Sequence, residues 1–162
     1  VGLMSAAAAV GGQNLGARKP ERTIQAVHSA AGMALVVALV VGSLFLLAPK
    51  QLLGVFGMTD PVTLQISVQL LRYLAVSAVF VCLALTYTGG LQGTGDTKGP
   101  LYISIVSQVV LPLGYCWVVQ ATRGLSASDI WLAIVLGHIT RAILSGLRFR
   151  QGNWRHIEVR VG

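Results

Sequence analysis

The sequence predicts an all-α fold, a polytopic transmembrane helical bundle, and three observations lead to this prediction. Residues 23–49, 73–95 and 99–122 contain no Asp, Glu, Lys or Arg, and each run exceeds the roughly 20 apolar residues that a helix needs to cross a bilayer. A fourth run, 124–147, is interrupted only by an aspartate near its start and an arginine near its end. The 162 residues are 54% hydrophobic and only 10% charged, whereas a soluble domain carries about 25% charged residues.

Turn and capping residues divide the chain into helices. Gly16 is expected to close the first helix, because glycine adopts the left-handed turn at a helix end most cheaply. Asp60 followed by Pro61 is typical of an N-cap and a first helical position, and Ser126 or Ser128 is expected to cap the last helix. The helical pieces predicted in this way are 1–16, 24–48, 66–93, 100–122 and 127–148. The first of them has no basic signal region and is interpreted as the end of a truncated helix.

The stretch GGLQGTGDTKGP at 89–100 is interpreted as a turn between two helices. Gly93 and Gly95 are expected to leave the preceding helix with positive φ, Asp96 or the threonine after it to hydrogen-bond the turn backbone, and Pro100 to start the next helix. The spacing matches neither phosphate-binding glycine pattern, and the glycines follow a helix-length run rather than a strand. A nucleotide site is therefore not expected.

Basic residues are distributed unequally between the two ends of the predicted helices. If the spans alternate in direction, one side holds eight Lys and Arg residues: three in loop 17–23, one in loop 94–99 and four at the C-terminal end. The other side holds only Lys50, Arg72 and Arg123. By the positive-inside rule the richer side, including the C-terminus, is cytoplasmic. We expect a partial transmembrane lobe over 1–148 and a basic cytoplasmic tail over 149–162 that contacts anionic lipid.

The net charge of +7 does not indicate a nucleic-acid partner. The basic residues lie at the ends of uncharged runs rather than on one face, and aromatic residues make up only 7% of the chain, which leaves no stacking platform for bases. The lipid bilayer is the partner that this composition predicts.

Polar side chains inside the spans are the candidate functional residues, because a polar group at membrane depth needs a partner or a wet cavity. Gln108 and Tyr115 lie with Ser104 on one helical face, in a segment that Pro112 can bend. Polar faces on broken spans form the binding sites of secondary transporters. Hydrogen bonding between helices is the competing interpretation.

Two further candidates lie on other spans. Tyr87 belongs to an aromatic face of the third span, for which packing is the competing role. His138 lies about twelve residues into the last span, or about 18 Å along a helix, near the midplane. Its imidazole could relay protons, or it could stay neutral and bond a neighbouring helix.

Several kinds of chemistry are not expected. The spans hold no carboxylate apart from Asp129 at the start of the last one, although ion-coupled transporters commonly use carboxylates within the membrane. Cys82 and Cys116 are expected to be buried thiols, with a disulfide as the alternative. No metal-binding or catalytic spacing occurs, so neither an enzyme nor a bound cofactor is predicted.

Three segments, AAAAVGGQNLGARKPERT at 6–23, GGLQGTGDTKGP at 89–100 and GLRFRQGNW at 146–154, together resemble the C-terminal half of the multidrug and toxic compound extrusion (MATE) family. The resemblance covers essentially the whole chain. It implies a MATE-like C-lobe consisting of four full spans plus the end of a fifth at the N-terminus. It also implies that the N-terminal lobe is missing from this sequence.

The resemblance further implies a secondary active efflux antiporter that exports organic cations or drugs in exchange for H⁺ or Na⁺, in the bacterial inner membrane. One branch of the family places a coupling carboxylate in the span that corresponds to 66–93, which has none here. We therefore expect the coupling ion to bind outside this chain. The alternative is a non-transporting membrane scaffold or small helical-bundle subunit.

Overall fold

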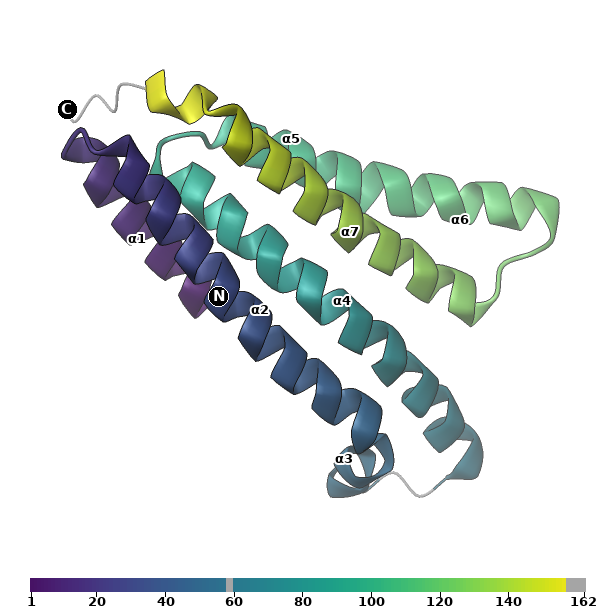
Figure 1. Cartoon of the computed structure of the whole chain (residues 1–162). Helices are drawn as coiled ribbons and strands as arrows, with labels where there is room; N and C mark the ends of the chain where they lie inside the picture. Colours follow the sequence, from purple (N-terminus) through teal and green to yellow (C-terminus); the bar gives the residue numbers. More distant parts are fainter. Residues whose placement is uncertain (58–59, 157–162) are drawn as a thin grey trace.

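Helices form almost all of the structure, a computed structural model that describes residues 1–57 and 60–156 (Figure 1). No strand occurs among these residues, and the all-α prediction is confirmed. The α-helices are α1 (Gly2–Gly16), α2 (Pro20–Leu47), α3 (Pro49–Val55), α4 (Pro61–Gly93), α5 (Lys98–Ile105), α6 (Leu111–Thr122) and α7 (Ala127–Gln151), with a π-helical turn η1 (Val106–Val110) and a 3₁₀ turn η2 (Asn153–His156).

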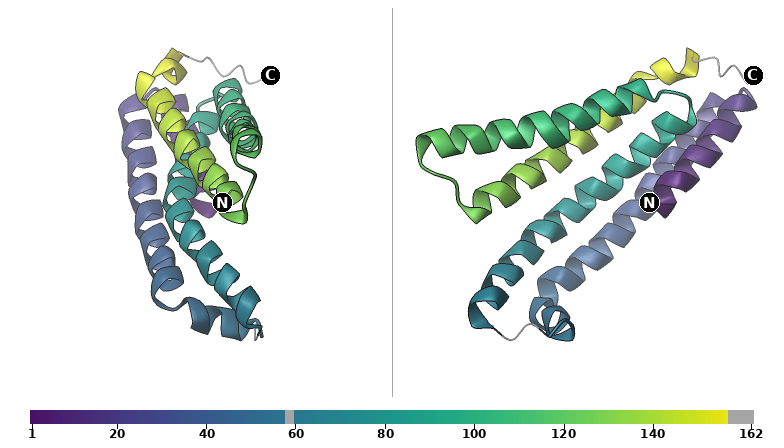
Figure 2. Two further views of the ribbon diagram at one scale, coloured as in Figure 1. Left: turned by 90° about the vertical axis from the view of Figure 1, so that its right-hand side faces the viewer. Right: turned by 180° about the vertical axis from the view of Figure 1, so that it is seen from behind.

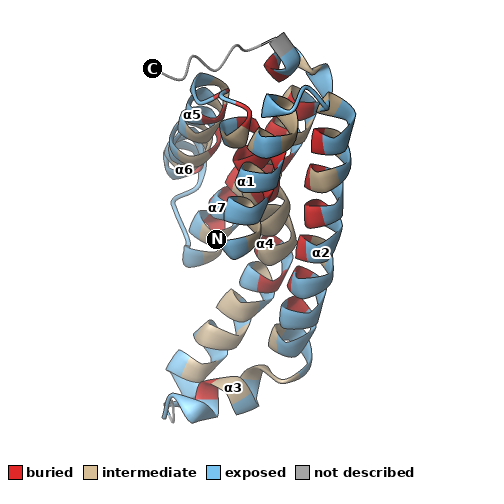
Figure 3. Ribbon diagram, turned by 90° about the vertical axis from the view of Figure 1, so that its left-hand side faces the viewer, coloured by how far each residue is buried: buried red, intermediate tan, exposed pale blue. Residues whose placement is uncertain are grey.

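Among the residues that the structure describes, four helical segments are long and apolar enough to cross a membrane. They are α2, α4, the continuous segment Lys98–Thr122 formed by α5, η1 and α6, and α7. In the apolar part of each segment, no more than 28% of the residues are buried within the chain. Large apolar side chains such as Val36, Val40 and Leu44 are more than half exposed on α2, and exposed residues cover the outer faces of the bundle in Figure 3. Lipid is the environment that such surfaces require.

The helices form two arms that diverge from a shared end (Figure 2). One arm contains α1, α2 and α4, and the other contains α5, α6 and α7, with α4 packed against α1, α2 and α7. The shared end gathers the α1–α2 turn, the α4–α5 turn and η2 (Figure 1). We call it the basic end, because it carries Arg18, Lys19, Arg22, Lys98, Arg148, Arg150 and Arg155.

A hydrophobic cluster near the basic end joins the C-terminal residues to the bundle. Phe149 and Trp154 are 2% and 1% exposed and pack with Val27 and Leu91. The two aromatic rings stack at 5.2 Å, and Trp154 Nε1 donates a hydrogen bond to the Phe149 carbonyl at 2.8 Å. The structure thus differs from the predicted tail: α7 continues past 148 and residues up to Trp154 belong to the lobe, while 157–162 lie outside the described residues.

Glycines allow α1 and α4 to approach each other closely. A Cβ on Gly89 would lie 2.3 Å from the Met4 carbonyl oxygen, and one on Gly93 would lie 2.1 Å from that of Ala8. Small residues four apart let helix backbones pack in this way in membranes. The prediction that Gly93 turns the chain with positive φ is wrong, because Gly93 is the last residue of α4 and serves this contact instead.

The α4–α5 turn depends on one left-handed glycine. Gly95 has φ +91°, its N–H bonds to the Gln92 carbonyl, and the Asp96 N–H bonds to the Leu91 carbonyl, both at 3.0 Å. These two bonds define a Schellman motif, so the prediction for Gly95 is confirmed. Pro100 does not start α5 but occupies its third position, where the missing N–H would have no helical partner in any case.

The first helix ends differently from the prediction. Arg18 takes the left-handed conformation at φ +56°, and its N–H bonds to the Leu15 carbonyl. Gly16 is the last residue of α1, without positive φ, and a Cβ there would meet nothing within 4 Å. The prediction for Gly16 is therefore wrong, because the Schellman bond from Lys19 N–H to Asn14 O places the turn two residues later.

Other helix starts follow capping chemistry. The Asp60 carboxylate accepts from the Thr63 N–H at 2.8 Å, and Ser126 forms a capping box with Asp129. α2 and α4 begin at prolines 20 and 61, earlier than the predicted 24 and 66. The prediction left out the first turn of each helix because these turns contain polar residues. A first turn at the membrane surface can hold polar residues, so both helices begin earlier. Both cysteines are free thiols, as expected, but they are half-buried rather than buried.

Candidate functional site

The segment opposite α7 contains a π-helical turn. The Leu111 N–H bonds to the Val106 carbonyl, five residues back, and the Ser107 hydroxyl donates to the Ile103 carbonyl at 2.6 Å. The turn lies directly before Pro112, which has no N–H to offer to the helix. Such turns occur mostly as single insertions in α-helices and frequently at functional sites.

Helix α7 meets this π-helical turn at Gly137. A Cβ there would lie 2.5 Å from the Ser107 carbonyl oxygen, 3.2 Å from Pro112 Cγ and 3.4 Å from Gln108 Nε2. The amide of Gln108 therefore lies over the backbone of α7, one residue before His138. A larger residue at 137 would separate the two helices.

Five buried polar atoms on three helical segments have no hydrogen-bond partner within the described part of the chain. Three of their residues share one face of α7 at spacings of three and four. Each unpaired buried group costs about 1–3 kcal/mol, and native proteins rarely leave several together. We call this set the polar seam: Thr88 Oγ1, Gln108 Nε2, His138 Nδ1, Arg141 Nε and Ser145 Oγ.

A cavity of about 350 Å³ adjoins the polar seam. It lies where α1, α4, α5 and α7 meet, and Thr88 and Arg141 of the seam line it. Its other lining residues are Met4, Gln92, Thr97, Lys98, Pro100, Leu101 and Ser104. We call it the seam cavity. Its volume falls within the range of small-molecule sites, and its charged lining residues are both cationic.

An ion pair closes the basic end beside the seam cavity. Arg148 Nε lies 2.9 Å from Asp96 Oδ2, and Asp96 Oδ1 accepts from the Gly99 N–H at 3.0 Å. The Asp96 side chain is 5% exposed and that of Arg148 35%. Asp96 therefore fixes the α4–α5 turn to α7 and hydrogen-bonds the turn backbone, as predicted.

The structure brings two of the four predicted cavity residues together. Gln108 and His138 both belong to the polar seam. Tyr115 lies half-buried on α6, two turns beyond Gln108. Tyr87 lines a different cavity, between α2 and α7, with Ile24 and His28. Contact with a transported molecule stays a prediction for all four residues.

Sequence reasoning missed the roles of Thr88 and Arg141. In the sequence Arg141 is only an arginine near the end of the last span, but in the structure its Nε is buried and its side chain lines the seam cavity. Its spacing from His138 and Ser145 on one helical face was the available signal. Thr88 could not be recognised, because only the packing of α4 shows that its hydroxyl is buried without a partner and that the residue lines the seam cavity. No cluster of three or more potential metal ligands occurs among the described residues.

Comparison with known proteins identifies the family. The MatE family matches residues 1–118. The chain belongs to this family. MatE relatives include a probable multidrug resistance protein NorM of Deinococcus radiodurans, 30% identical over 149 residues, which covers 90% of this chain and 33% of the relative. A NorM of Thermotoga maritima is 26% identical over 94% of this chain and 33% of the relative.

Solved MatE structures share the fold. An inward-facing multidrug resistance MATE family transporter superimposes with a TM-score of 0.84 at 23% identity, over 98% of this chain and 37% of that one. The eukaryotic MATE transporter AtDTX14 gives a TM-score of 0.80 at 22% identity, over 94% of this chain and 34% of that one. The chain spans about a third of the length of these relatives. It is a multi-pass membrane protein of a family of transporters rather than enzymes.

Proposed function

We propose that this chain forms the C-terminal lobe of a secondary active multidrug efflux antiporter. The polar seam carries the proposal, because its unpaired polar atoms are buried within apolar helices long enough to span a membrane, and two of its residues, Thr88 and Arg141, line a cavity. Transporters build their binding sites from such residues. The relatives named as multidrug resistance proteins support drugs or organic cations as substrates.

The rest of the transporter would complete the seam cavity. Its charged lining residues in this chain, Lys98 and Arg141, are both cationic, so an organic cation would require carboxylates from an N-terminal lobe. The same lobe would supply the acid that binds the exchanged H⁺ or Na⁺. Movement of the two lobes against each other would then open the cavity alternately to each side.

The proposed orientation places the basic end in the cytoplasm. Seven described Lys and Arg residues lie there, against three near the far ends of the arms, and such an excess marks cytoplasmic ends. The α4–α5 turn and the C-terminus would then face the cytoplasm of a bacterial cell, and the α6–α7 loop the opposite side.

Drug accumulation in cells that lack other efflux pumps tests the proposal. The full-length transporter is expressed with Gln108→Ala, His138→Ala or Thr88→Ala, and with Ser43→Ala as the control. Ser43 is exposed on α2 and only bonds the Leu39 carbonyl of its own helix. We expect the seam variants to retain several cationic dyes that the parent and the control export, at equal amounts of protein in the membrane.

Two results would speak against the proposal. Cells with and without the intact parent could accumulate every tested cation equally, as the scaffold alternative requires. Alternatively, all three seam variants could export as fast as the control, in which case the seam would be internal packing only.

A further inference from the structure

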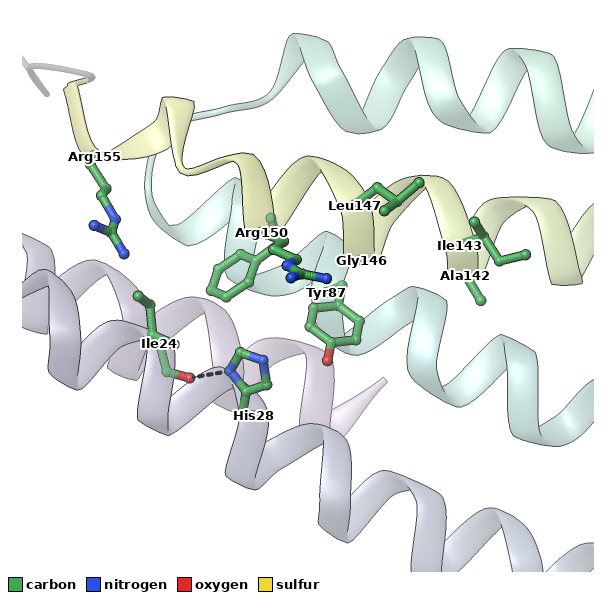
Figure 4. A pocket seen from close by; sticks show the side chains of 10 residues that line it. Ile24, His28, Tyr87, Ala142, Ile143, Gly146, Leu147, Arg150 and Arg155 are labelled. Carbon is green, nitrogen blue, oxygen red and sulfur yellow. Dashed lines mark hydrogen bonds between the residues drawn. The ribbon is translucent and has the colours of Figure 1, made fainter.

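A second cavity, about 500 Å³ in volume, lies between α2 and α7 (Figure 4). It shares no lining residue with the seam cavity. Tyr87 of α4 lies in its floor. At 100° per residue, Tyr87 points about 140° around α4 from Gln92, which lines the seam cavity, so the two cavities lie on different faces of α4. We call it the α2–α7 groove. Its lining includes Ile24, His28, Tyr87, Gly146, Arg150 and Arg155.

Two arginines form the rim of the groove at the basic end. Arg150 is exposed and has no ion-pair partner within the described residues. Arg155 lies 3.6 Å from Glu21, but that carboxylate is 74% exposed, so water screens the pair and leaves it weak. The rim therefore carries an excess of positive charge that the described chain does not neutralise.

The floor of the groove is aromatic and apolar. The Tyr87 ring lies 5.7 Å from that of Phe149 and 6.0 Å from that of His28. The His28 Nδ1–H donates to the Ile24 carbonyl at 2.8 Å, which directs this polar edge into its own helix (Figure 4). On α7 the groove continues along Leu147 and Ile143, which are 50% and 54% exposed.

The groove runs along α7 from the membrane surface into the apolar region. Ala142 and Arg150 mark its ends on this helix, and their separation of eight positions corresponds to about 12 Å along the helix axis. A ligand that complements the groove has an anionic group at the basic end and a hydrocarbon chain along the apolar part of α7. Lipid enters freely, because the apolar α7 residues are exposed to the bilayer.

We infer that the α2–α7 groove binds an anionic phospholipid, with its phosphate between Arg150 and Arg155 and an acyl chain along Leu147 and Ile143. Guanidinium groups pair with phosphate through parallel hydrogen bonds, and basic pockets between membrane helices bind lipid headgroups. The site is separate from the proposed transport cavity and does not depend on what is transported.

Native mass spectrometry of the intact transporter in detergent, titrated with phosphatidylglycerol or phosphatidylcholine, tests this inference. We expect phosphatidylglycerol to bind the parent more tightly. Arg150→Gln with Arg155→Gln should weaken that binding roughly 25-fold, at about fivefold for each basic residue near a lipid phosphate. Lys19→Gln with Arg22→Gln removes the same charge from exposed positions at the same end and should leave the affinity unchanged.

A second variant tests the groove without altering charge. A Cβ on Gly146 would meet only the Tyr87 ring, at 3.9 Å, so the backbone of α7 accepts a side chain there, and Gly146→Leu is expected to fill the floor of the groove. It should also reduce phosphatidylglycerol binding, while drug export persists. Equal binding of the two lipids by the parent would overturn the inference. So would an equal loss of affinity in the Arg150/Arg155 variant and in the Lys19/Arg22 control, if Gly146→Leu also bound phosphatidylglycerol normally.

Discussion

Replacing Gly93 with alanine tests how α1 and α4 are held together. The new Cβ would lie 2.1 Å from the Ala8 carbonyl oxygen and 2.6 Å from its Cα. Both are backbone atoms, so no side-chain rotation relieves the overlap, and α1 must recede by roughly 1 Å or more to restore van der Waals contact. Overpacking of this kind costs about 1–3 kcal/mol.

Gly16→Ala is the matched control. Gly16, like Gly93, is the last residue of its helix and has no positive φ, and a Cβ there would meet nothing within 4 Å. Both substitutions therefore change helix propensity at the same position of a helix, by less than the roughly 1 kcal/mol of an interior glycine, so the difference between the variants isolates the packing of α1 against α4. We expect Gly93→Ala to be about 1–3 kcal/mol less stable than Gly16→Ala.

The assay is the apparent Tm of the intact transporter, measured by size-exclusion chromatography after heating. One kcal/mol corresponds to about 2–4 °C for a unit of 150–250 residues, so the Tm of Gly93→Ala should be lower by several degrees. A Tm for Gly93→Ala equal to or above that of Gly16→Ala would refute the close approach of α1 and α4.

Two further predictions concern the helix ends. Asp96→Asn and Arg148→Gln should each lower the Tm, because Asp96 is nearly buried and the Arg148 side chain is only 35% exposed. The double variant should lose less stability than the sum of the two single losses, with a coupling of about 0.5–3 kcal/mol. Additive losses would contradict the ion pair. Hydrogen bonds from the Thr63 side chain and backbone lower the pKa of Asp60, so its contribution to stability is present above the unfolded-state pKa of about 3.9 and lost as the pH falls through the folded-state value. Asp60→Asn should remove this part of the acid dependence, and a melting series in which parent and variant lose stability in parallel below pH 4 would contradict it.

Most of the fold could be predicted from the sequence, because runs without charge have few physical alternatives to membrane spans. Proline and capping residues also identified the N-caps Asp60 and Ser126, although the predicted helix after Asp60 began five residues too late. The left-handed residue of the first turn could not be predicted. Arginine is an unfavourable choice for φ +56°, and only the hydrogen bonds around it place the turn at Arg18.

The candidate site was only partly predictable. Gln108 and His138 stood out because polar residues in apolar runs are unusual. The π-helical turn and the partners of each polar face depend on contacts between helices distant in sequence, such as Gly137 against Ser107. The assignment of Gly93 failed for the same reason, since close helix packing and a left-handed turn both favour glycine.

Cysteine labelling tests most directly whether the polar seam opens onto an aqueous pathway. Gln108→Cys and Ser104→Cys are made in the intact transporter after Cys82 and Cys116 are replaced by serine, with Val36→Cys as a control on the lipid-exposed face of α2. A water-soluble maleimide should react at positions 104 and 108 in at least one conformational state, more slowly with a transported cation present, and should leave position 36 unmodified. Inert thiols at both positions 104 and 108 in every state, or labelling that no cation slows, would contradict the account.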